Sequence, residues 1–433
     1  EKHPDLETFH PASVLVTGFD IIFFWVARMI MMSMKFMDEV PFHTVYVHGL
    51  VRDGEGQKMS KSKGNVLDPI DLIDGIELET LIAKRTSNLM QPQLAAKIEK
   101  ATRKQFPDGI TGYGTDALRY TFYSLASTGR DIKFDIGRME GYRNFCNKIW
   151  NASRYVMSHA EGHDLGEGTT PLSLTDRWIR SRLEVTLQTV EAAYDSYRFD
   201  LASQALYDFV WNEFCDWYLE LSKPVLWDDN ATGADQQATR KTLIVVLEQS
   251  LRMLHPFMPF VTEELWGTTT DRTRMLVHGD WPTYSTAEML DADADRELNW
   301  VIGLIESIRS ARAQMHVPAG LKVPMLYTAM DDAGQTAWDR NEAMIKRLAR
   351  VETLEKTESF PKGTVSIAAP GASFGLPLAG LIDIDAEKTR LQKSLDKLGK
   401  EIGGLKGRLN NPKFAASAPA EGVAEAQSNL DAR

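Results

Sequence analysis

Two short β-branched segments on either side of an apolar helical stretch constrain the fold of the N-terminal part most strongly. Residues 13–17 and 44–48 have the composition of buried strands, and residues 21–34 between them form the most apolar run of the chain. A strand, a helix and a second strand in this order predict a parallel α/β sheet. Arg28 interrupts the apolar run, which is shorter than the roughly 20 residues that a membrane span needs. We therefore expect a buried helix and no membrane segment.

Long helical patterns follow from about residue 80 onward. The predicted helices cover residues 141–158, 176–197, 201–221, 236–255 and 296–314, which is the pattern of a helix bundle. Between residues 322 and 369, short β-rich runs alternate with one helix at 337–349, which predicts a small α+β appendage. The chain is therefore expected to be multidomain and mainly α-helical.

The last regular element is a heptad helix. Its apolar positions are spaced alternately by four and three residues, as in the seam of a coiled coil: Leu391, Leu395, Leu398, Ile402, Leu405 and Leu409. One such stripe cannot bury itself, so a partner helix is required. Pro412 and the alanine-rich stretch after it predict the turn into a returning arm.

Composition limits the setting and the chemistry. A net charge of −11 usually argues against a nucleic-acid partner. The run between Lys84 and Lys104 is basic, however, and an acidic protein with a basic face can still bind RNA. The two cysteines, Cys146 and Cys215, lie far apart and build neither a disulfide framework nor a four-cysteine zinc site, so we predict no metal centre. The chain starts at Glu1 without a signal-peptide core, and we expect a piece of a longer, cytoplasmic protein.

The most informative stretch for chemistry is the segment 56–65, called the lysine loop below. It reads GQKMSKSKGN, with Lys58 and Lys61 three residues apart on a loop flanked by glycines. Both ammonium groups can swing onto one polyphosphate, and cations placed where negative charge develops on a leaving pyrophosphate lower the barrier. A bare KxxK would be a solvated linker, but this one follows a strand and a turn and precedes Pro69, which opens a predicted helix.

The run Lys58, Met59, Ser60, Lys61 and Ser62 resembles the second signature of the class I aminoacyl-tRNA synthetases. The segment around Thr17 and Trp25 is similar to the pocket segment of the valine branch, and residues 212–218 resemble the start of an anticodon-binding bundle. The resemblance implies a two-step reaction in which the carboxylate of valine attacks the α-phosphate of ATP, bound with Mg²⁺, and the tRNA for valine then takes the valyl group. It also implies a monomer.

The same resemblance assigns roles to the predicted parts of the chain. Residues 1–75 correspond to the C-terminal part of a Rossmann-like α/β catalytic domain and 76–140 to a connecting region that contacts the tRNA stem. Residues 141–320 correspond to the anticodon-binding helix bundle, 321–384 to the α+β appendage and 385–433 to a truncated coiled-coil arm that binds tRNA. In the arm, basic residues outnumber acidic ones, although a solvated coiled-coil surface would look the same.

By position in the signature, Lys58 and Lys61 are implied to be catalytic, and Lys58, Met59, Ser60, Lys61 and Ser62 to bind ATP. The resemblance places His48 and Gly49 near the adenine, and Thr17, Gly18, Asp20 and Trp25 around the aminoacyl adenylate. Each also has a simpler explanation. Trp25 could be a core residue, Asp20 could favour the positive end of a helix, and His48 could be a structural histidine. Asp116 and Arg119 are expected to brace their own helix rather than touch substrate.

The chain also departs from the family pattern. The first signature, a His-x-Gly-His type helix start, is absent, and so is the inserted editing domain that hydrolyses mischarged threonyl-tRNA in the valine branch. His159 and His163 enclose a superficially similar motif, which we reject because its spacing is one residue too long and it follows the lysine loop. We therefore expect this piece to be inactive alone. Two alternatives stay open: isoleucine as the substrate, and a non-catalytic tRNA-binding module or synthetase paralogue.

Overall fold

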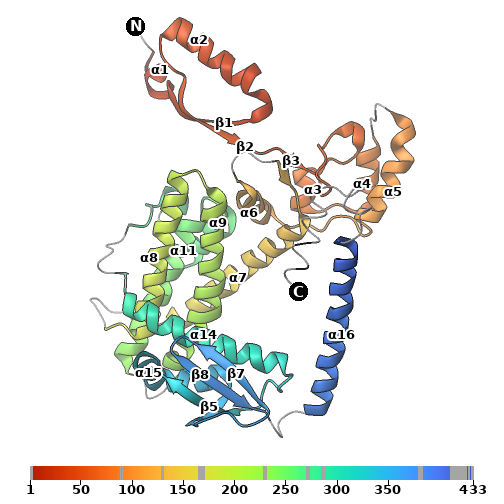
Figure 1. Ribbon diagram of the computed structural model, residues 1–433. Helices are drawn as coiled ribbons and strands as arrows, with labels where there is room; N and C mark the ends of the chain where they lie inside the picture. The colour runs from red at the N-terminus through yellow and green to blue at the C-terminus, as the bar shows by residue number, and fades with distance from the viewer. Residues whose placement is uncertain are drawn as a thin grey trace. The chain divides into compact units, whose positions relative to one another are not determined.

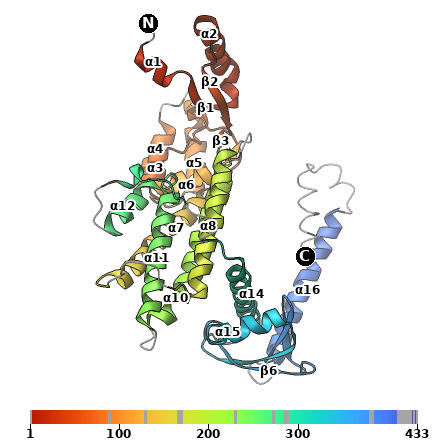
Figure 2. The same ribbon diagram turned by 90° about the vertical axis from the view of Figure 1, so that its left-hand side faces the viewer.

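The structure is a computed structural model of the chain. It describes residues 3–87, 89, 91–127, 131–163, 171–227, 232–269, 274–283, 289–378, 384–409, 427 and 430. The chain divides into two compact units, Glu1–Asp295 and Arg296–Arg433, and each is described by itself. Figures 1 and 2 show the elements of both units from two directions.

The N-terminal strands form the parallel pair that their order predicts. After a short helix, α1 (Pro4–Phe9), strand β1 (Ala12–Gly18) lies beside β2 (Phe42–His48). Their register pairs Gly18 with His48, so both strands end at the same edge. Helix α2 (Ala27–Met37) makes the crossover between them (Figure 1).

The prediction that this crossover helix is buried is wrong. In the π-helical turn Ile22–Val26 and in α2, the only buried residue is Val26, whereas Phe23 is 76% exposed and Met31 is 69% exposed. Among the described residues β1 pairs with β2 alone. A sheet of two strands, which lie about 4.8 Å apart, is too narrow to cover an apolar helix of this length.

A compact helical region follows, closed by the parallel pairing of β3 (Val51–Arg52) with β4 (Ile132–Lys133). Between these strands lie the turn Lys61–Lys63 and helices α3 (Pro69–Asp74), α4 (Leu78–Thr86), α5 (Ala95–Gln105) and α6 (Thr115–Leu125). Pro69 occupies the first turn of α3, as predicted, because its missing N–H is not needed there. The core that joins these elements consists of Leu72, Leu81, Phe106, Ile110, Leu118, Phe134 and Met139.

The predicted helix bundle is confirmed. It contains α7 (Ile136–Ala160), α8 (Leu174–Asp195), α9 (Phe199–Asp208), the π-helical segment Phe209–Tyr218, α10 (Leu219–Leu226), α11 (Gly233–Leu254) and α12 (Pro259–Thr269). Deep inside it, the fully buried carboxylate of Asp176 accepts hydrogen bonds from Tyr218 (2.5 Å) and Ser173 (2.7 Å). Phe214, Trp217 and Tyr218 are buried, so they belong to the core and do not offer an exposed base-stacking surface.

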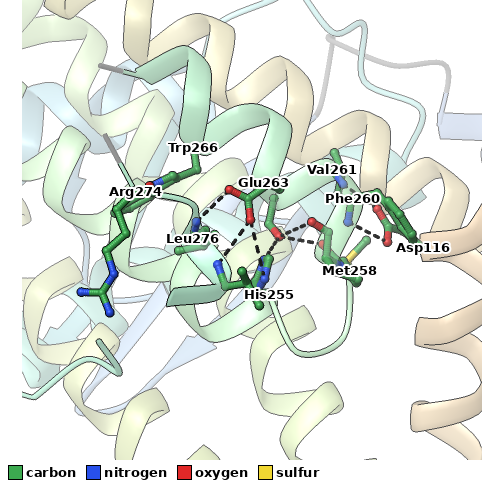
Figure 3. A network of polar contacts seen from close by, with 12 residues as sticks. Asp116, His255, Met258, Phe260, Val261, Glu263, Trp266, Arg274 and Leu276 are labelled. Atoms are coloured by element: carbon green, nitrogen blue, oxygen red, sulfur yellow. Dashed lines mark hydrogen bonds and ion pairs between the residues drawn. The ribbon is translucent and has the colours of Figure 1, made fainter. Parts of the chain in front are cut away.

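Helix α6 is tied to the bundle by a polar network (Figure 3). The carboxylate of Asp116 accepts hydrogen bonds from the backbone N–H groups of Phe260 (3.3 Å) and Val261 (2.7 Å) in the first turn of α12. Arg119 donates to the backbone carbonyls of Pro256 (2.9 Å) and Phe257 (3.3 Å). Asp116 and Arg119 therefore brace a neighbouring helix, not their own as the sequence suggested.

The second unit contains the predicted α+β appendage. Its sheet has the order β6-β5-β8-β7, formed by β5 (Val323–Met330), β6 (Val351–Lys356), β7 (Thr364–Ala369) and β8 (Ala372–Pro377). Strands β5 and β6 are parallel, and the other pairs are antiparallel. Helix α14 (Ala292–Gln314) leads into this unit, and α15 (Asp332–Ala349) connects β5 to β6.

The C-terminal arm is described only in part. Helix α16 (Ile384–Leu409) carries the heptad positions, and Leu395 is 62% exposed. The predicted returning segment from Pro412 onward lies outside the described residues. The coiled coil therefore stays a prediction.

We expect Asp116→Ala to lower the free energy of unfolding by about 1–3 kcal/mol, because two helix N–H groups lose their acceptor. Burial raises the pKa of Asp116 despite its hydrogen bonds from Val261 and Phe260. A raised folded-state pKa means that the stabilisation is fully present below the unfolded-state pKa and declines as the pH rises through the folded-state pKa. The loss in the variant should thus be larger near about pH 4 than near about pH 7.

Urea unfolding of the chain at several pH values measures this effect. The exposed Asp108 is the matched control, and Asp108→Ala should change the free energy of unfolding by less than about 0.5 kcal/mol. Equal losses in the two variants would show that the bonds to α12 contribute nothing.

Candidate functional site

The carboxyl ends of β1 and β2 bring five of the predicted site residues together. Gly18 lies opposite His48, and Gly49 follows directly. A methyl group added to Gly18 would lie 2.8 Å from Oδ1 of Asp20 and 3.7 Å from Cε1 of His48, so these two side chains approach the same glycine. Thr17 is buried beside them. Ligands of parallel sheets bind beyond such strand ends, and glycine leaves room for them.

The structure tests two of the simpler explanations, that Trp25 is a core residue and that His48 is a structural histidine. Trp25 is 43% exposed, so it is not a core residue among the described part of the chain. The Nδ1 atom of His48 lies 2.8 Å from the carbonyl oxygen of Gly49, which fixes the ring close to its own backbone. Trp25 therefore presents an aromatic surface, whereas the half-buried ring of His48 is held by its own backbone through Nδ1.

The lysine loop is held at its base by Asp53 and Asn65. The carboxylate of Asp53 accepts hydrogen bonds from the backbone N–H groups of Glu55 (3.1 Å) and Gln57 (2.7 Å) and from the side chain of Asn65 (2.8 Å). Asn65 in turn accepts a hydrogen bond from the backbone N–H of Ser60 (2.9 Å). These two side chains therefore join the start, the middle and the end of the loop.

Electrostatics at the loop base favour an ionised Asp53. Although burial acts in the opposite direction, the hydrogen bonds from Asn65, Gln57 and Glu55 lower the pKa of Asp53, with a contribution from the charge of Lys63. A carboxylate that stays ionised keeps its acceptor capacity at all physiological pH values. The closure of the loop does not depend on titration near neutral pH.

The ammonium groups of the two central lysines take no part in this base. Lys58 and Lys61 are exposed, and no hydrogen bond or ion pair joins their ammonium groups to another described residue. Lys61 begins the short turn Lys61–Lys63, which ends at Gly64 in the left-handed conformation with φ of 62°. A side chain at Gly64 would lie 2.6 Å from Ile98 of α5, so only glycine allows this close packing. The backbone is thus fixed while the ammonium groups remain available.

A cavity of about 310 Å³ lies beside the loop. Its lining residues come from the loop, from α3 and α4 and from positions next to these elements: Lys61, Gly64, Val66, Asp68, Asp71, Leu81, Lys84, Arg85 and Ser87. Lys84 bridges the carboxylates of Asp68 (2.6 Å) and Asp71 (2.7 Å), and its hydrogen bond lowers the pKa of Asp68. None of the strand-end residues lines this cavity, so it does not join the two predicted halves of the site.

Sequence reasoning missed the groups that hold the loop. Asn65 lies within the quoted signature stretch, but its carboxamide was not assigned a role, and Asp53 lies twelve residues earlier along the chain. The glycine and asparagine after the lysines were the available signal, since both residue types favour tight turns. Among the described residues no cluster of three or more His, Cys, Asp or Glu side chains could hold a metal ion. No helix in that part of the chain is long and apolar enough to cross a membrane.

Three protein-family models match separate parts of the chain, which together make up most of it. Residues 1–135 match the class I tRNA synthetases for isoleucine, leucine, methionine and valine, and residues 176–327 match the anticodon-binding domain of tRNA ligases. Residues 383–433 match the tRNA-binding arm of valyl-tRNA synthetases. The crystal structure of a leucyl-tRNA synthetase complex from Agrobacterium radiobacter K84 matches 65% of this chain and 30% of that chain, with a TM-score of 0.46 and 18% identity, which is too distant to carry an argument.

Curated relatives give the more specific result. The valine–tRNA ligase of Ruegeria pomeroyi is 51% identical over 100% of this chain and 39% of the relative. The valine–tRNA ligases of Legionella pneumophila and Acinetobacter baylyi are 49% and 50% identical over 99% and 96% of this chain, and 47% and 44% of the relatives. The chain thus spans less than half the length of these relatives. It belongs to the class I aminoacyl-tRNA synthetases, within their valine branch.

Proposed function

We propose that the chain is part of a valine–tRNA ligase, which activates valine with ATP and transfers it to the tRNA for valine. In the first step a carboxylate oxygen of valine attacks the α-phosphorus of ATP, and pyrophosphate leaves with the electron pair of the broken P–O bond. In the second step a hydroxyl of the terminal ribose attacks the valyl carbonyl, and AMP leaves. The observation that carries this proposal is the lysine loop, with its fixed backbone and two exposed ammonium groups.

In this proposal Lys58 and Lys61 bind the β- and γ-phosphates and neutralise the charge that develops on the leaving pyrophosphate. Met59, Ser60 and Ser62 complete the ATP-binding segment through backbone N–H groups and hydroxyls. Magnesium arrives with ATP as part of the substrate, because Mg²⁺ keeps phosphate oxygens and waters as most of its ligands.

The strand ends supply the second half of the proposed site. His48 and Gly49 lie where the adenine is expected, and the small Gly18 allows the nucleotide to approach the backbone. Thr17, Asp20 and the exposed face of Trp25 form the side expected to hold the aminoacyl adenylate. The carboxylate of Asp20 is suited to the ammonium group of valine, since the two charges are opposite.

We further propose that this piece does not activate valine alone. Both faces of a parallel sheet are normally covered, yet Val16 of β1 is 58% exposed and Phe23 is 76% exposed. We propose that a further part of the intact ligase, beyond the stretch that matches the relatives here, covers this apolar surface. In the intact ligase it would bring the first signature and the editing domain. The intact ligase is proposed to be a cytoplasmic monomer.

Lys61→Ala should reduce valine-dependent pyrophosphate–ATP exchange by about 10²–10³-fold, because a cation is lost at the leaving pyrophosphate. The exchange is measured in a protein in which the upstream half of a relative precedes this chain. Lys63→Ala, in the same turn, is the control and should change the rate less than about tenfold. Undiminished exchange in Lys61→Ala contradicts the proposed role, and a parent protein without any exchange favours the non-catalytic paralogue.

Asn65→Ala should lower kcat for adenylate formation with a smaller change in the KM for valine, because the loop loses its link between Asp53 and Ser60. Misplacing a catalytic group by about 1 Å can cost about 10²-fold in rate. Asn65→Asp keeps the acceptor for Ser60 but places a second carboxylate beside Asp53, so it should not restore the rate. Full activity in Asn65→Ala would show that these bonds do not position the lysines.

A further inference from the structure

Tyr46 joins strand β2 to the helix bundle through two aromatic contacts. The centroid of its ring lies 5.9 Å from that of Tyr197 and 5.7 Å from that of Phe199. Tyr197 lies in the turn between α8 and α9, and Phe199 begins α9. Aromatic rings at such distances attract each other beyond the effect of burial alone. A strand of the proposed catalytic site is therefore in direct contact with the bundle.

Tyr46 shares a face of β2 with a residue of the proposed site. Side chains alternate between the two faces of a strand, so Tyr46 and His48, two residues apart, lie on the same face. In the pairing with β1, Tyr46 lies opposite Val16 and His48 lies opposite Gly18. A shift or rotation of β2 that moves the ring of Tyr46 therefore also moves the ring of His48.

The turn that receives Tyr46 has a fixed shape. Tyr197 has a φ of 54°, in the left-handed region that bulky residues adopt only where their surroundings enforce it. The backbone N–H of Arg198 donates to the carbonyl of Ala193 (2.7 Å). The guanidinium of Arg198 also donates two hydrogen bonds to the carboxylate of Asp200 (2.8 and 2.7 Å). These contacts hold the turn in one conformation.

Phe199 extends the contact into the interior of the bundle. Its ring centroid lies 6.0 Å from those of Tyr194 in α8 and Tyr123 in α6. Both of these rings contact Phe257, which is fully buried, at 6.0 and 4.8 Å. The aromatic cluster comprises Tyr46, Tyr123, Tyr194, Tyr197, Phe199 and Phe257. Tyr46 is the member of this cluster that belongs to the β1–β2 sheet.

The ring of Tyr46, and not its hydroxyl, makes the connection. The hydroxyl oxygen is buried and has no hydrogen-bond partner among the described residues. A buried hydroxyl without a partner is unfavourable, so it does not hold the side chain in place. Packing of the ring must do so. Removing the hydroxyl and removing the ring should therefore have different effects.

We propose that Tyr46 is a positioning residue, which packs into the aromatic cluster and thereby fixes the end of β2 that carries His48 and Gly49. This inference rests on the proposed function, which places the adenine of ATP beside these two residues. Tyr46 itself touches no substrate and acts through the backbone of its strand. A displacement of about 1 Å can cost about 10²-fold in rate, so such support has consequences for catalysis.

Hydrogen exchange of the β2 amides tests the anchoring in the intact ligase, in which the upstream half of a relative precedes this chain. Tyr46→Ser should accelerate exchange by about tenfold or more, whereas Tyr46→Phe should leave it nearly unchanged. The matched control is Val45→Ser, which removes an exposed apolar side chain from the adjacent position of the same strand. It should accelerate exchange by less than about threefold. Equal acceleration in Tyr46→Ser and Val45→Ser would overturn the proposal.

Valine-dependent pyrophosphate–ATP exchange tests the effect on the site. Tyr46→Ser should raise the KM for ATP by about fivefold or more and change the KM for valine by less than about twofold, because the adenine side of the site is displaced. Tyr46→Phe should retain the parent values. Equal changes in the two KM values, or an unchanged KM for ATP, would contradict a positioning role.

Phe199→Leu provides a second variant that leaves β2 itself intact. It keeps an apolar side chain but loses the ring that Tyr46 contacts, so it should also raise the KM for ATP. The double variant with Tyr46→Ser should exceed Tyr46→Ser alone by less than about twofold, because both changes remove the same contact. Independent, multiplicative effects would refute the proposal. If the parent ligase shows no pyrophosphate exchange, the proposed function is in error, and the hydrogen-exchange result still decides the anchoring.

Discussion

The clamp between α6 and the start of α12 is the interaction on which the arrangement of the first unit depends. Asp116 and Arg119 bind the backbone around the turn between α11 and α12, while Leu118 between them belongs to the core below the lysine loop. Tyr120 is fully buried and donates a hydrogen bond to the carbonyl of Ser203 in α9 (2.7 Å). One helix thus shares side chains with two cores, which makes the loop region and the bundle continuous.

The lysine loop combines a fixed backbone with exposed charge. Its rigidity comes from polar closure through Asp53 and Asn65 and from the tight packing of Gly64 on Ile98. Charged ends that met a partner inside the protein would not be available to a polyphosphate. Leaving Lys58 and Lys61 without a partner among the described residues costs little in water, because an exposed ion pair contributes only about 0–1 kcal/mol.

Local charge matters more here than the overall charge. The chain is acidic as a whole, yet the exposed Lys97, Lys100 and Lys104 follow one another by three and four residues on α5. Exposed charges interact over about a Debye length, roughly 8 Å at physiological salt, so the local charge of a surface can differ in sign from the net charge of the chain. The exposed apolar side chains of β1 and α2 are the other surface that departs from an ordinary soluble protein.

The sequence by itself determined the order and type of the main elements, because strand and helix periodicities are local properties of the chain. The β1–α2–β2 unit, the long bundle helices, the α+β appendage and the signature lysines were all predictable in this way. The burial of α2 was not, since burial depends on which elements cover a surface. The roles of Asp116, Asp53, Asn65 and Ile98 were decided only by the tertiary structure. Asp53 meets Asn65 across 12 residues of chain, and Asp116 meets Val261 across 145. Ile98 and Gly64 belong to separate elements that meet only when the chain folds.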